Sequence, residues 1–500
     1  MLAWTIYISF LGILLLMLLP KGAVRAARIL ALLTAVAGFV VTLVGFAQQS
    51  GQLVTVARSP WVPSLGVEYY LASDGISLTL LLLTGIVAIS GVLFSWNVEY
   101  RAKEFFAFYL ALIGGVYGVF LSFDLLLLFV FYEIAIIPKY FLIAIWGSTR
   151  REYAAMKLAL YSFVGSAMVL IGLIAAYVVA GAKTMDLAQL SQFPFPVHFQ
   201  MWAFPLVFAG FGILAGLWPF HTWAPTGHVA APTAASMLLA GVVMKLGAYG
   251  CLRFAISLFP RGLDAWGFHV LGFGSWRDVF ALCALIGIVY GAMVALVQKD
   301  FKFVIGYSSV SHMGFVLLGL MTLQQIGLDG AVLQMFSHGI VAGLLFAVVG
   351  RMVYDRTHTR DLSELETMHL NKAIPFAAAT FVLGGMASIG LPGFSGFVAE
   401  LQVLIGAWHQ FPLFAVVAGL GIVIGIAYTW RAMQKAFFGA SDHNAAIPSL
   451  PAISTPERLG AIMLIAASVV IGLYPQLLLR VIVPALHSPL FDGLWKGSGR

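Results

Sequence analysis

The sequence predicts an all-α polytopic membrane protein with about 14 transmembrane helices. Of its 500 residues, 61% are hydrophobic and only 9% are charged, and the mean hydropathy is +0.98. Soluble proteins contain about 25% charged residues. The apolar runs are also long and continuous, unlike the ~10-residue alternating segments of a transmembrane barrel. Both observations favour a bundle of membrane-spanning helices.

Apolar runs of about 20 residues, enough to cross a hydrocarbon core of ~30 Å, recur along the whole chain. They predict spans at residues 2–20, 28–47, 76–96, 105–123, 124–146, 156–180, 202–220, 232–255, 279–298, 302–322, 329–350, 373–406, 411–436 and 459–483. The first run lacks a basic leader and a small-residue cleavage site, so we expect a retained helix rather than a signal peptide. No linker divides the chain, so one membrane domain is expected over residues 1–500.

Two spans are interrupted by proline and glycine. The seventh runs into residues 216–228, and the twelfth contains residues 390–396. Proline removes a backbone donor and glycine loosens the helix, and such a break survives at membrane depth only inside protein or beside water. Two interrupted spans five helices apart predict two inverted repeats. The expected parts are three N-terminal helices, two five-helix repeats and a last helix, at residues 1–104, 105–255, 279–436 and 459–483.

Lys and Arg predict the orientation, because they gather in cytoplasmic loops. The loops after odd-numbered spans hold 17 of these residues, Lys302 among them. The other loops and the C-terminus hold 8, among them Arg253 and Arg500. We therefore expect a bacterial inner-membrane protein with its N-terminus on the periplasmic side. Membrane topology explains the net charge of +7, so no nucleic-acid partner is expected.

Three charged residues lie in the middle of apolar runs: Glu133, Lys245 and Glu400. A charge at the centre of a membrane helix costs at least about 2.5–3.5 kcal/mol. Desolvation favours the neutral forms of lysine and glutamate alike, so a buried Lys–Glu pair can store a proton whose location depends on its partner. Three such charges predict an ion path, most simply for protons. The alternative is a structural ion pair that holds helices together.

Proton movement needs titratable groups within about one water molecule of each other. The other candidates are one lysine and four histidines: Lys139, His221, His228, His312 and His338. Both His312 and His338 have serine neighbours that could support a water-linked relay. The alternatives are histidines bonded to backbone carbonyls and a Lys139 side chain that snorkels to the cytoplasmic surface. Asp124 is expected to cap a helix.

Nothing in the sequence indicates a cofactor or a metal site. The two cysteines, Cys251 and Cys283, stand in apolar surroundings without a CxxC spacing. No Cys/His cluster suggests iron–sulfur or haem ligation, and no glycine-rich phosphate loop precedes a helix. We therefore expect this chain to bind neither metal nor cofactor.

Several motifs resemble those of the antiporter-like membrane subunits of respiratory complex I, and the resemblance extends over nearly the whole chain. They are FYEIAIIP at 131–138, PFHTWAP at 219–225, HVAAPTA at 228–234, MKLGAYG at 244–250, SSVSHMGF at 308–315 and GLPGF at 390–394. The fourteen-helix length and the segment YDRTHTRD at 354–361 are similar to chain M rather than to chains L or N.

The resemblance implies a proton-translocating subunit of NADH–quinone oxidoreductase. It implies that NADH, FMN, iron–sulfur clusters and quinone bind to partner subunits, and that the neighbours are L-type and N-type chains or a second M-type chain, with lipids around them. Glu133, Lys245 and Glu400 match the family's glutamate of the fifth helix, lysine of the eighth and glutamate of the twelfth. The alternative is a related Na⁺/H⁺ antiporter complex or a membrane-bound hydrogenase. A stand-alone solute carrier is disfavoured, because the breaks lack non-titratable polar groups for a substrate.

One departure from the family pattern concerns the broken seventh helix. The family has a lysine seven residues before the motif histidine, and here that position is Leu214. An acid is also absent, since Pro-Asp-Ala-His is replaced by Pro-Thr-Gly-His at 225–228. Three hypotheses remain open: Lys139 takes the missing role, His221 or a water molecule does, or the unit no longer pumps normally. A variant complex with two M-type chains is also compatible.

Overall fold

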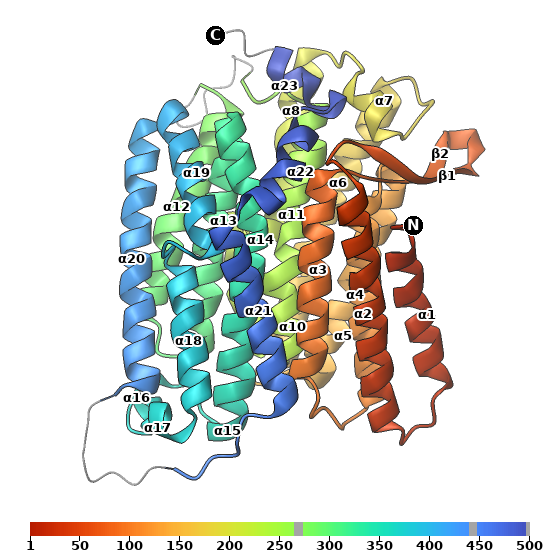
Figure 1. Cartoon of the computed structure of the whole chain (residues 1–500). Coiled ribbons are helices and arrows are strands. Elements are labelled where there is room, and N and C mark those ends of the chain that lie inside the picture. Colours follow the sequence, from red (N-terminus) through yellow and green to blue (C-terminus); the bar gives the residue numbers. More distant parts are fainter. Residues whose placement is uncertain (265–273, 440–447, 497–500) are drawn as a thin grey trace.

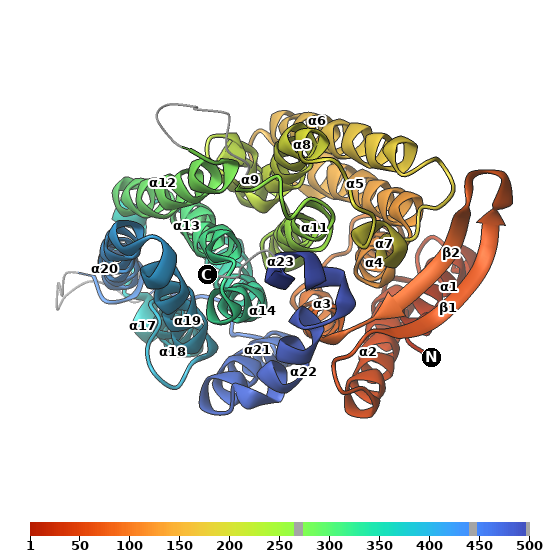
Figure 2. The same ribbon diagram turned by 90° about the horizontal axis from the view of Figure 1, so that it is seen from above.

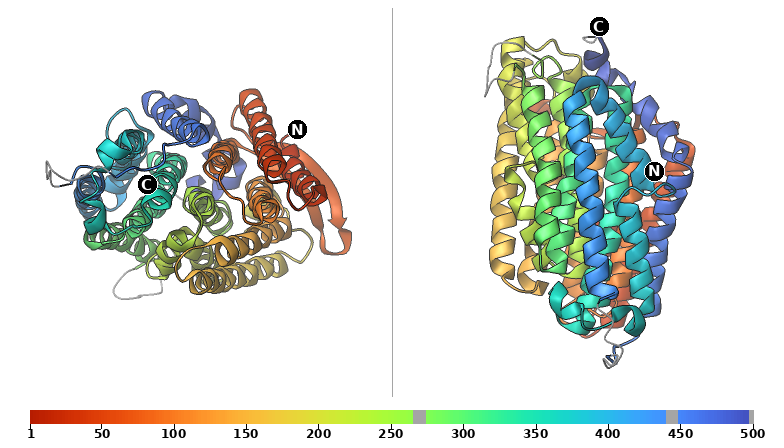
Figure 3. Two further views of the ribbon diagram at one scale, coloured as in Figure 1. Left: turned by 90° about the horizontal axis from the view of Figure 1, so that it is seen from below. Right: turned by 90° about the vertical axis from the view of Figure 1, so that its left-hand side faces the viewer.

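The computed structural model describes residues 1–264, 274–439 and 448–496. Long helices run side by side through the bundle (Figures 1 and 3), which confirms the polytopic helical fold. The first eight helices are α1 (Trp4–Leu18), α2 (Val24–Gln48), α3 (Gly75–Phe94), α4 (Ala102–Leu121), α5 (Leu125–Trp146), α6 (Arg151–Val179), α7 (Leu187–Ser191) and α8 (Val197–Ala215). Asp124 caps α5 as expected, because its carboxylate accepts the backbone N–H groups of Leu126 and Leu127.

The helices of the middle of the chain follow the break after α8. They are α9 (Trp223–Ala230), α10 (Thr233–Leu238), α11 (Met244–Gly250), α12 (Trp276–Val297), α13 (Phe301–Thr322), α14 (Gln325–Ala347), α15 (Asp355–Thr357), α16 (Leu362–Leu365) and α17 (Leu370–Ala373). The remaining helices are α18 (Pro375–Ser388), α19 (Ser395–Gln410), α20 (Pro412–Phe437), α21 (Thr455–Leu473), α22 (Gln476–Leu486) and α23 (Asp492–Lys496). Short 3₁₀ turns lie at Pro63–Leu65, Phe220–Thr222 and Pro489–Phe491.

Twelve helical stretches among the described residues are long and apolar enough to cross a membrane, and the bent pair Gln476–Leu486 and Pro489–Trp495 makes up to thirteen. Helices occupy all fourteen predicted spans. Two predicted spans, 2–20 and 373–406, contain the shorter apolar helices α1 and α18. The count of fourteen therefore stays a prediction, as do the two inverted repeats.

Both predicted breaks are present. Helix α8 ends at Gly216, which has φ = 84°, and α9 follows only after a 3₁₀ turn. Helix α18 ends before Gly390 and Gly393, at φ = 70° and 99°, and α19 begins at Ser395. Glycine adopts this left-handed region without the strain that a side chain would cause. The two breaks therefore lie where the sequence predicts them.

The centre of the bundle is formed by α3, α11 and α14, and the other long helices surround them (Figure 2). All the residues of α10 and α11 but one, and almost all of α14, are buried. Three π-helical segments interrupt these central helices: Leu239–Val243, Cys251–Ile256 and Val348–Tyr354. π-Helical turns are rare and often mark functional sites.

A β-hairpin was not expected from the sequence, which suggested only a polar stretch at 48–75. Strands β1 (Val54–Val62) and β2 (Val67–Ser73) pair antiparallel and project sideways from the bundle (Figures 1 and 2). Arg58 holds the hairpin, because its guanidinium contacts Glu68 at 2.5 Å and Asp186 at 2.9 Å. Glu68 accepts a hydrogen bond from the Arg58 guanidinium and so raises the pKa of Arg58, which means that this arginine stays charged.

The hairpin, α7 and α23 lie at one end of the bundle, here called the upper end, and α15–α17 lie at the other, the lower end (Figure 1). Two basic residues that the sequence analysis placed in loops are buried in helical segments. Arg253 pairs with Asp74 at 2.7 Å, and both side chains are 0% exposed. Lys302 is buried in α13. Arg500 lies outside the described residues.

Candidate functional site

Four of the predicted site residues, which lie between positions 245 and 400, form one continuous row. The amine nitrogen of Lys245 lies 2.8 Å from Nδ1 of His338. The rings of His338 and His312 stack with centroids 5.5 Å apart. Nδ1 of His312 then lies 3.0 Å from Oε1 of Glu400. We call Lys245, His338, His312 and Glu400 the central chain.

Each member of the central chain comes from a different helix. Lys245 lies in α11, directly after the π-helical segment Leu239–Val243, and donates a hydrogen bond to the carbonyl of Ala240. His312 and His338 lie in α13 and α14. Glu400 lies in the second turn of α19, just beyond the break, as the sequence predicts. The helix dipole acts mainly within the first turn, so side-chain contacts dominate the environment of this carboxylate.

The Glu400 end of the central chain is rich in hydrogen bonds. Nε2 of Gln334 donates to Oε1 of Glu400 at 3.1 Å, and Nε2 of His312 lies 3.2 Å from the hydroxyl of Ser388. Gly390 lies so close that a side chain there would meet Oε2 of Glu400 at 3.0 Å. A small cavity of about 10 Å³ is lined by both histidines and by Glu400. That volume suffices for about one water molecule.

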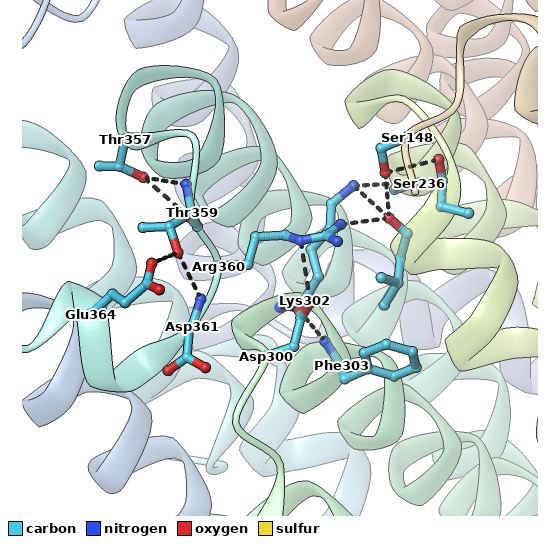
Figure 4. A network of polar contacts seen from close by, with 12 residues as sticks. Ser148, Ser236, Asp300, Lys302, Phe303, Thr357, Thr359, Arg360, Asp361 and Glu364 are labelled. Atoms are coloured by element: carbon cyan, nitrogen blue, oxygen red, sulfur yellow. Dashed lines mark hydrogen bonds and ion pairs between the residues drawn. The ribbon is translucent and has the colours of Figure 1, made fainter. Parts of the chain in front are cut away.

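Lys302 is a candidate that sequence reasoning missed. It is 2% exposed, and its amine donates to the carbonyl of Ala231 at 3.0 Å and, over 3.4 Å each, to the carbonyl of Val229 and the hydroxyl of Ser236. Figure 4 shows this amine pointing at the turn that follows α9. Although Lys299 and Asp300 precede it, Lys302 stands directly between Phe301 and Phe303, and this apolar setting is the signal that could have revealed it.

An ion pair lies beside the backbone of Lys302. Arg360 pairs with Asp300 at 3.2 Å and also donates to the carbonyl of Val229 at 3.1 Å (Figure 4). Asp300 in turn caps α13 by accepting the backbone N–H groups of Lys302 and Phe303. The turn after α9 is therefore held in place independently of the Lys302 side chain.

His228 is a further predicted site residue that the structure buries completely. Its ring packs against the rings of Phe346 and Trp223, and interacts electrostatically with both Lys245 and Lys302. Neither ring nitrogen has a hydrogen-bonding partner among the described residues. The backbone carbonyl of His228 accepts the hydroxyl of Ser236 at 2.7 Å.

Glu133 and Lys139 form a second, looser pair within α5. Lys139 is 1% exposed and does not snorkel to the surface. It interacts electrostatically with Glu133, which is also a neighbour of Ser166 in α6. The Lys139 amine and Oε1 of Glu133 have no hydrogen-bonding partner among the described residues. Pro138 lies inside α5 between them and removes one backbone donor.

The described contacts do not join Glu133 to Lys245. The ring of Tyr132, beside Glu133, packs edge-on against Phe211 at 5.7 Å. Leu214 is buried where α8 approaches α11, so close that a side chain at Gly247 would meet the Leu214 backbone at 2.9 Å. The position at which the family has a lysine is thus filled by an apolar contact.

His221 stands apart from both groups. It is buried, and its ring meets the rings of Tyr290 and Tyr307 at 5.2 and 6.4 Å. Its ring nitrogens, like those of His228, have no hydrogen-bonding partner within the described part of the chain. The structure therefore does not bring His221 to the central chain.

The sequence matches a family model described as "NADH:quinone oxidoreductase/Mrp antiporter, TM" over residues 122–425. NADH-quinone oxidoreductase subunit M of Rhodobacter capsulatus is 36% identical over 93% of this chain and 90% of its own length. Subunit M of Pseudomonas aeruginosa is 34% identical over 97% of this chain and 96% of its own length.

The fold is also similar to solved structures. A chain of respiratory complex I from Thermus thermophilus superposes with a TM-score of 0.87 at 28% identity, covering 99% of this chain and 100% of that chain. A chain of the Mrp complex from Dietzia gives 0.84 at 22% identity, covering 98% and 97%, and shows the shared fold alone. The chain therefore belongs to the family of antiporter-like membrane subunits that NADH:quinone oxidoreductases and Mrp antiporters share, and within it to the subunit M type.

Proposed function

We propose that this chain moves protons across the membrane through the central chain, as one pumping unit of NADH:quinone oxidoreductase. The observation that carries the proposal is the row Lys245–His338–His312–Glu400, in which each side chain contacts the next. Lysine, histidine and glutamate can each gain and lose a proton, which a relay requires.

Each residue has a distinct role in this proposal. Lys245 stores a proton at the centre of the bundle, and His338 takes it at Nδ1. Stacked rings cannot bond edge to edge, so one water in the cavity beside them would carry the proton from His338 to His312. His312 passes it to Glu400, from which it leaves. While the proton is on His338, its positive charge disfavours protonation of Lys245, so the row accepts a second proton only after the first has moved on.

Protons rather than sodium ions fit the chemistry of the row. A sodium ion is a hard cation that needs several oxygen ligands. Within the central chain only Glu400 offers carboxylate oxygens, and protonated lysine offers none. The relatives with 34–36% identity are NADH-quinone oxidoreductase subunits, which favours that complex over a Na⁺/H⁺ antiporter complex or a hydrogenase.

The first half of the chain has a smaller part in this proposal. We propose that Lys139 replaces the missing amine of position 214 and forms the Lys–Glu pair with Glu133. Burial of Lys139 and its electrostatic contact with Glu133 support this assignment. The alternatives are that His221 or water takes that role, or that this half does not pump.

The surroundings of the chain complete the proposal. The lower end faces the cytoplasm of a bacterium, and the N-terminus faces the periplasm, which agrees with the excess of Lys and Arg at the lower end. NADH, FMN, iron–sulfur clusters and quinone are bound by partner subunits. The membrane-arm neighbours are L-type and N-type chains or a second M-type chain, and lipids cover the rest.

The test replaces Lys245 by methionine in the assembled complex in native membrane vesicles. We expect NADH-driven proton transport to fall at least about tenfold, because a positioned proton-transfer group contributes ~10²–10⁴-fold. The exposed Lys372→Met variant is the matched control. NADH oxidation by an artificial acceptor measures the amount of assembled complex. Normal transport by Lys245→Met would refute the central chain.

A further inference from the structure

A cavity of about 190 Å³ lies at the lower end of the bundle, where α3, α4 and α5 end near α13. Its wall includes the polar residues Ser95, Asn97, Ser148, Thr233, Lys302 and Asp355. A water molecule needs only ~10–15 Å³ of such a cavity, so the cavity has room for several water molecules. Asn97 is exposed, whereas Lys302 is buried, so the cavity leads from the surface to the lysine.

Gly350 lies against Thr233 and Lys302 at the inner end of this cavity, where it leaves space for both side chains. A side chain at Gly350 would meet the hydroxyl of Thr233 at 2.6 Å and Cε of Lys302 at 3.4 Å. Gly350 belongs to the π-helical segment Val348–Tyr354. Of the three hydrogen bonds of the amine, only the bond to the Ala231 carbonyl is short. The other two N–H groups are weakly held and can turn to water.

The inner side of Lys302 leads toward the central chain. The hydroxyl of Ser236 accepts a hydrogen bond from the Lys302 amine over 3.4 Å and donates one to the backbone carbonyl of His228 at 2.7 Å. His228 interacts electrostatically with both Lys302 and Lys245, and its ring nitrogens have no hydrogen-bonding partner among the described residues. His228 is therefore the titratable group through which Lys302 can reach Lys245.

We propose that this cavity is the vestibule through which protons enter from the lower end, and that Lys302 is the first titratable group they meet. The inference rests on the proposed function of the central chain. A hydronium ion in the cavity gives its proton to the lone pair of the neutral Lys302 amine and becomes water. The new N–H bond then breaks as the proton passes to a ring nitrogen of His228, and the amine is neutral again.

A structural role for Lys302 makes a different prediction, so two substitutions are compared. Lys302→Met removes the amine, and Lys302→Arg keeps a positive charge and donors but cannot release a proton. We expect both variants to lower NADH-driven proton transport about five- to tenfold in assembled complex, given ~10²–10⁴-fold for a positioned proton-transfer group. Lys299→Met and Lys299→Arg, at an exposed lysine three residues away, are the controls. Normal transport by Lys302→Arg overturns the relay role and leaves a structural one.

The vestibule is tested separately with Thr233→Cys. A small, charged methanethiosulfonate reagent is added to vesicles of each orientation. We expect the cysteine to react only from the lower end and the reaction to slow proton transport at least about fivefold, as loss of a proton-transfer path does. Asn97→Cys, at the exposed mouth, is the positive control, and the unmodified chain gives the background from Cys251 and Cys283. No reaction at Thr233→Cys from the lower end overturns the vestibule.

Lys245→Met, measured alongside, separates the two proposals. If it transports normally, the central chain fails and the vestibule fails with it. If it stops transport while both Lys302 variants are normal, only the further inference fails. If Lys302→Met does not assemble, the arginine variant and the cysteine labelling decide.

Discussion

Two groups of ionisable residues in this molecule differ in how their members contact one another. The pair Glu133 and Lys139 in α5 is here called the first half, and the central chain is called the second half. In the second half, Lys245, His338, His312 and Glu400 contact one another and are braced by Gln334 and Ser388. In the first half, Glu133 and Lys139 interact electrostatically, but the Lys139 amine and Oε1 of Glu133 lack hydrogen-bonding partners among the described residues. Buried ionisable groups therefore do not make a relay by their presence alone.

The difference has a local cause in the broken helix α8. Gly247 of α11 lies against backbone atoms of Phe211, Leu214 and Ala215, and Gly250 lies against the Phe211 ring, so the two helices approach closely. Position 214 is therefore close to α11, two residues from Lys245 along that helix. Leucine can neither gain nor lose a proton, so position 214 supplies no titratable group beside α11. We infer that the second half carries most of the proton current.

The largest effect on proton transport is expected from replacing His338, which lies in the middle of the central chain. His338→Leu removes the ring that touches both Lys245 and His312. Proton transport by assembled complex should fall at least about tenfold, since the relay loses a member within hydrogen-bond reach. His409→Leu, at an exposed histidine, is the control. Normal transport by His338→Leu would remove the basis of the comparison.

An intermediate effect is expected in the first half. Lys139→Leu should lower proton transport roughly threefold, because this half has no hydrogen-bonded row whose loss would stop transport. The double variant Lys139→Leu with Leu214→Lys returns the amine to the family position and should recover part of the rate. The measurement is the initial rate of NADH-driven proton uptake per assembled complex. A tenfold loss with Lys139→Leu would show that both halves are equally needed.

The smallest effect is expected at His221. The ring of this histidine meets tyrosine rings and no described hydrogen-bonding partner. His221→Phe should therefore change proton transport less than about twofold, because proton transfer requires hydrogen-bond reach. If His221→Phe matches the loss expected for His338→Leu, then His221 rather than Lys139 supplies the missing group of the first half.

Sequence patterns predicted the helical fold well, because each apolar run has the length that a membrane requires. The two breaks were predicted from Pro and Gly, whose backbone preferences are local. The β-hairpin was missed: segments 54–62 and 67–73 carry the Val, Thr and Tyr residues typical of strands, but polar residues beside long helices suggest a loop. The pairing of β1 with β2 depends on contacts that hydropathy does not describe.

The candidate site was predicted as a set of residues but not as a geometry. Glu133 and Lys245 looked like natural partners, yet the described contacts do not join them, and position 214, where the resemblance leads one to expect a lysine, holds a leucine. Lys302 was counted as a loop charge because it follows Lys299 and Asp300. In the structure its amine instead bonds to the carbonyl of Ala231, which is 71 positions away in the sequence. Such long-range packing cannot be derived from local patterns.

The π-helical segment Leu239–Val243 determines how α10 is rotated about the helix axis relative to α11. It contains one residue more per turn than an α-helix accommodates, and it lies between Thr233 at the cavity and Lys245 at the centre. Removing a single residue here would convert the segment to α-helix and turn α10 about 100° relative to α11. Thr233 and Lys245 would then face different neighbours. The alignment of inlet and centre is thus set by the insertion of one amino acid.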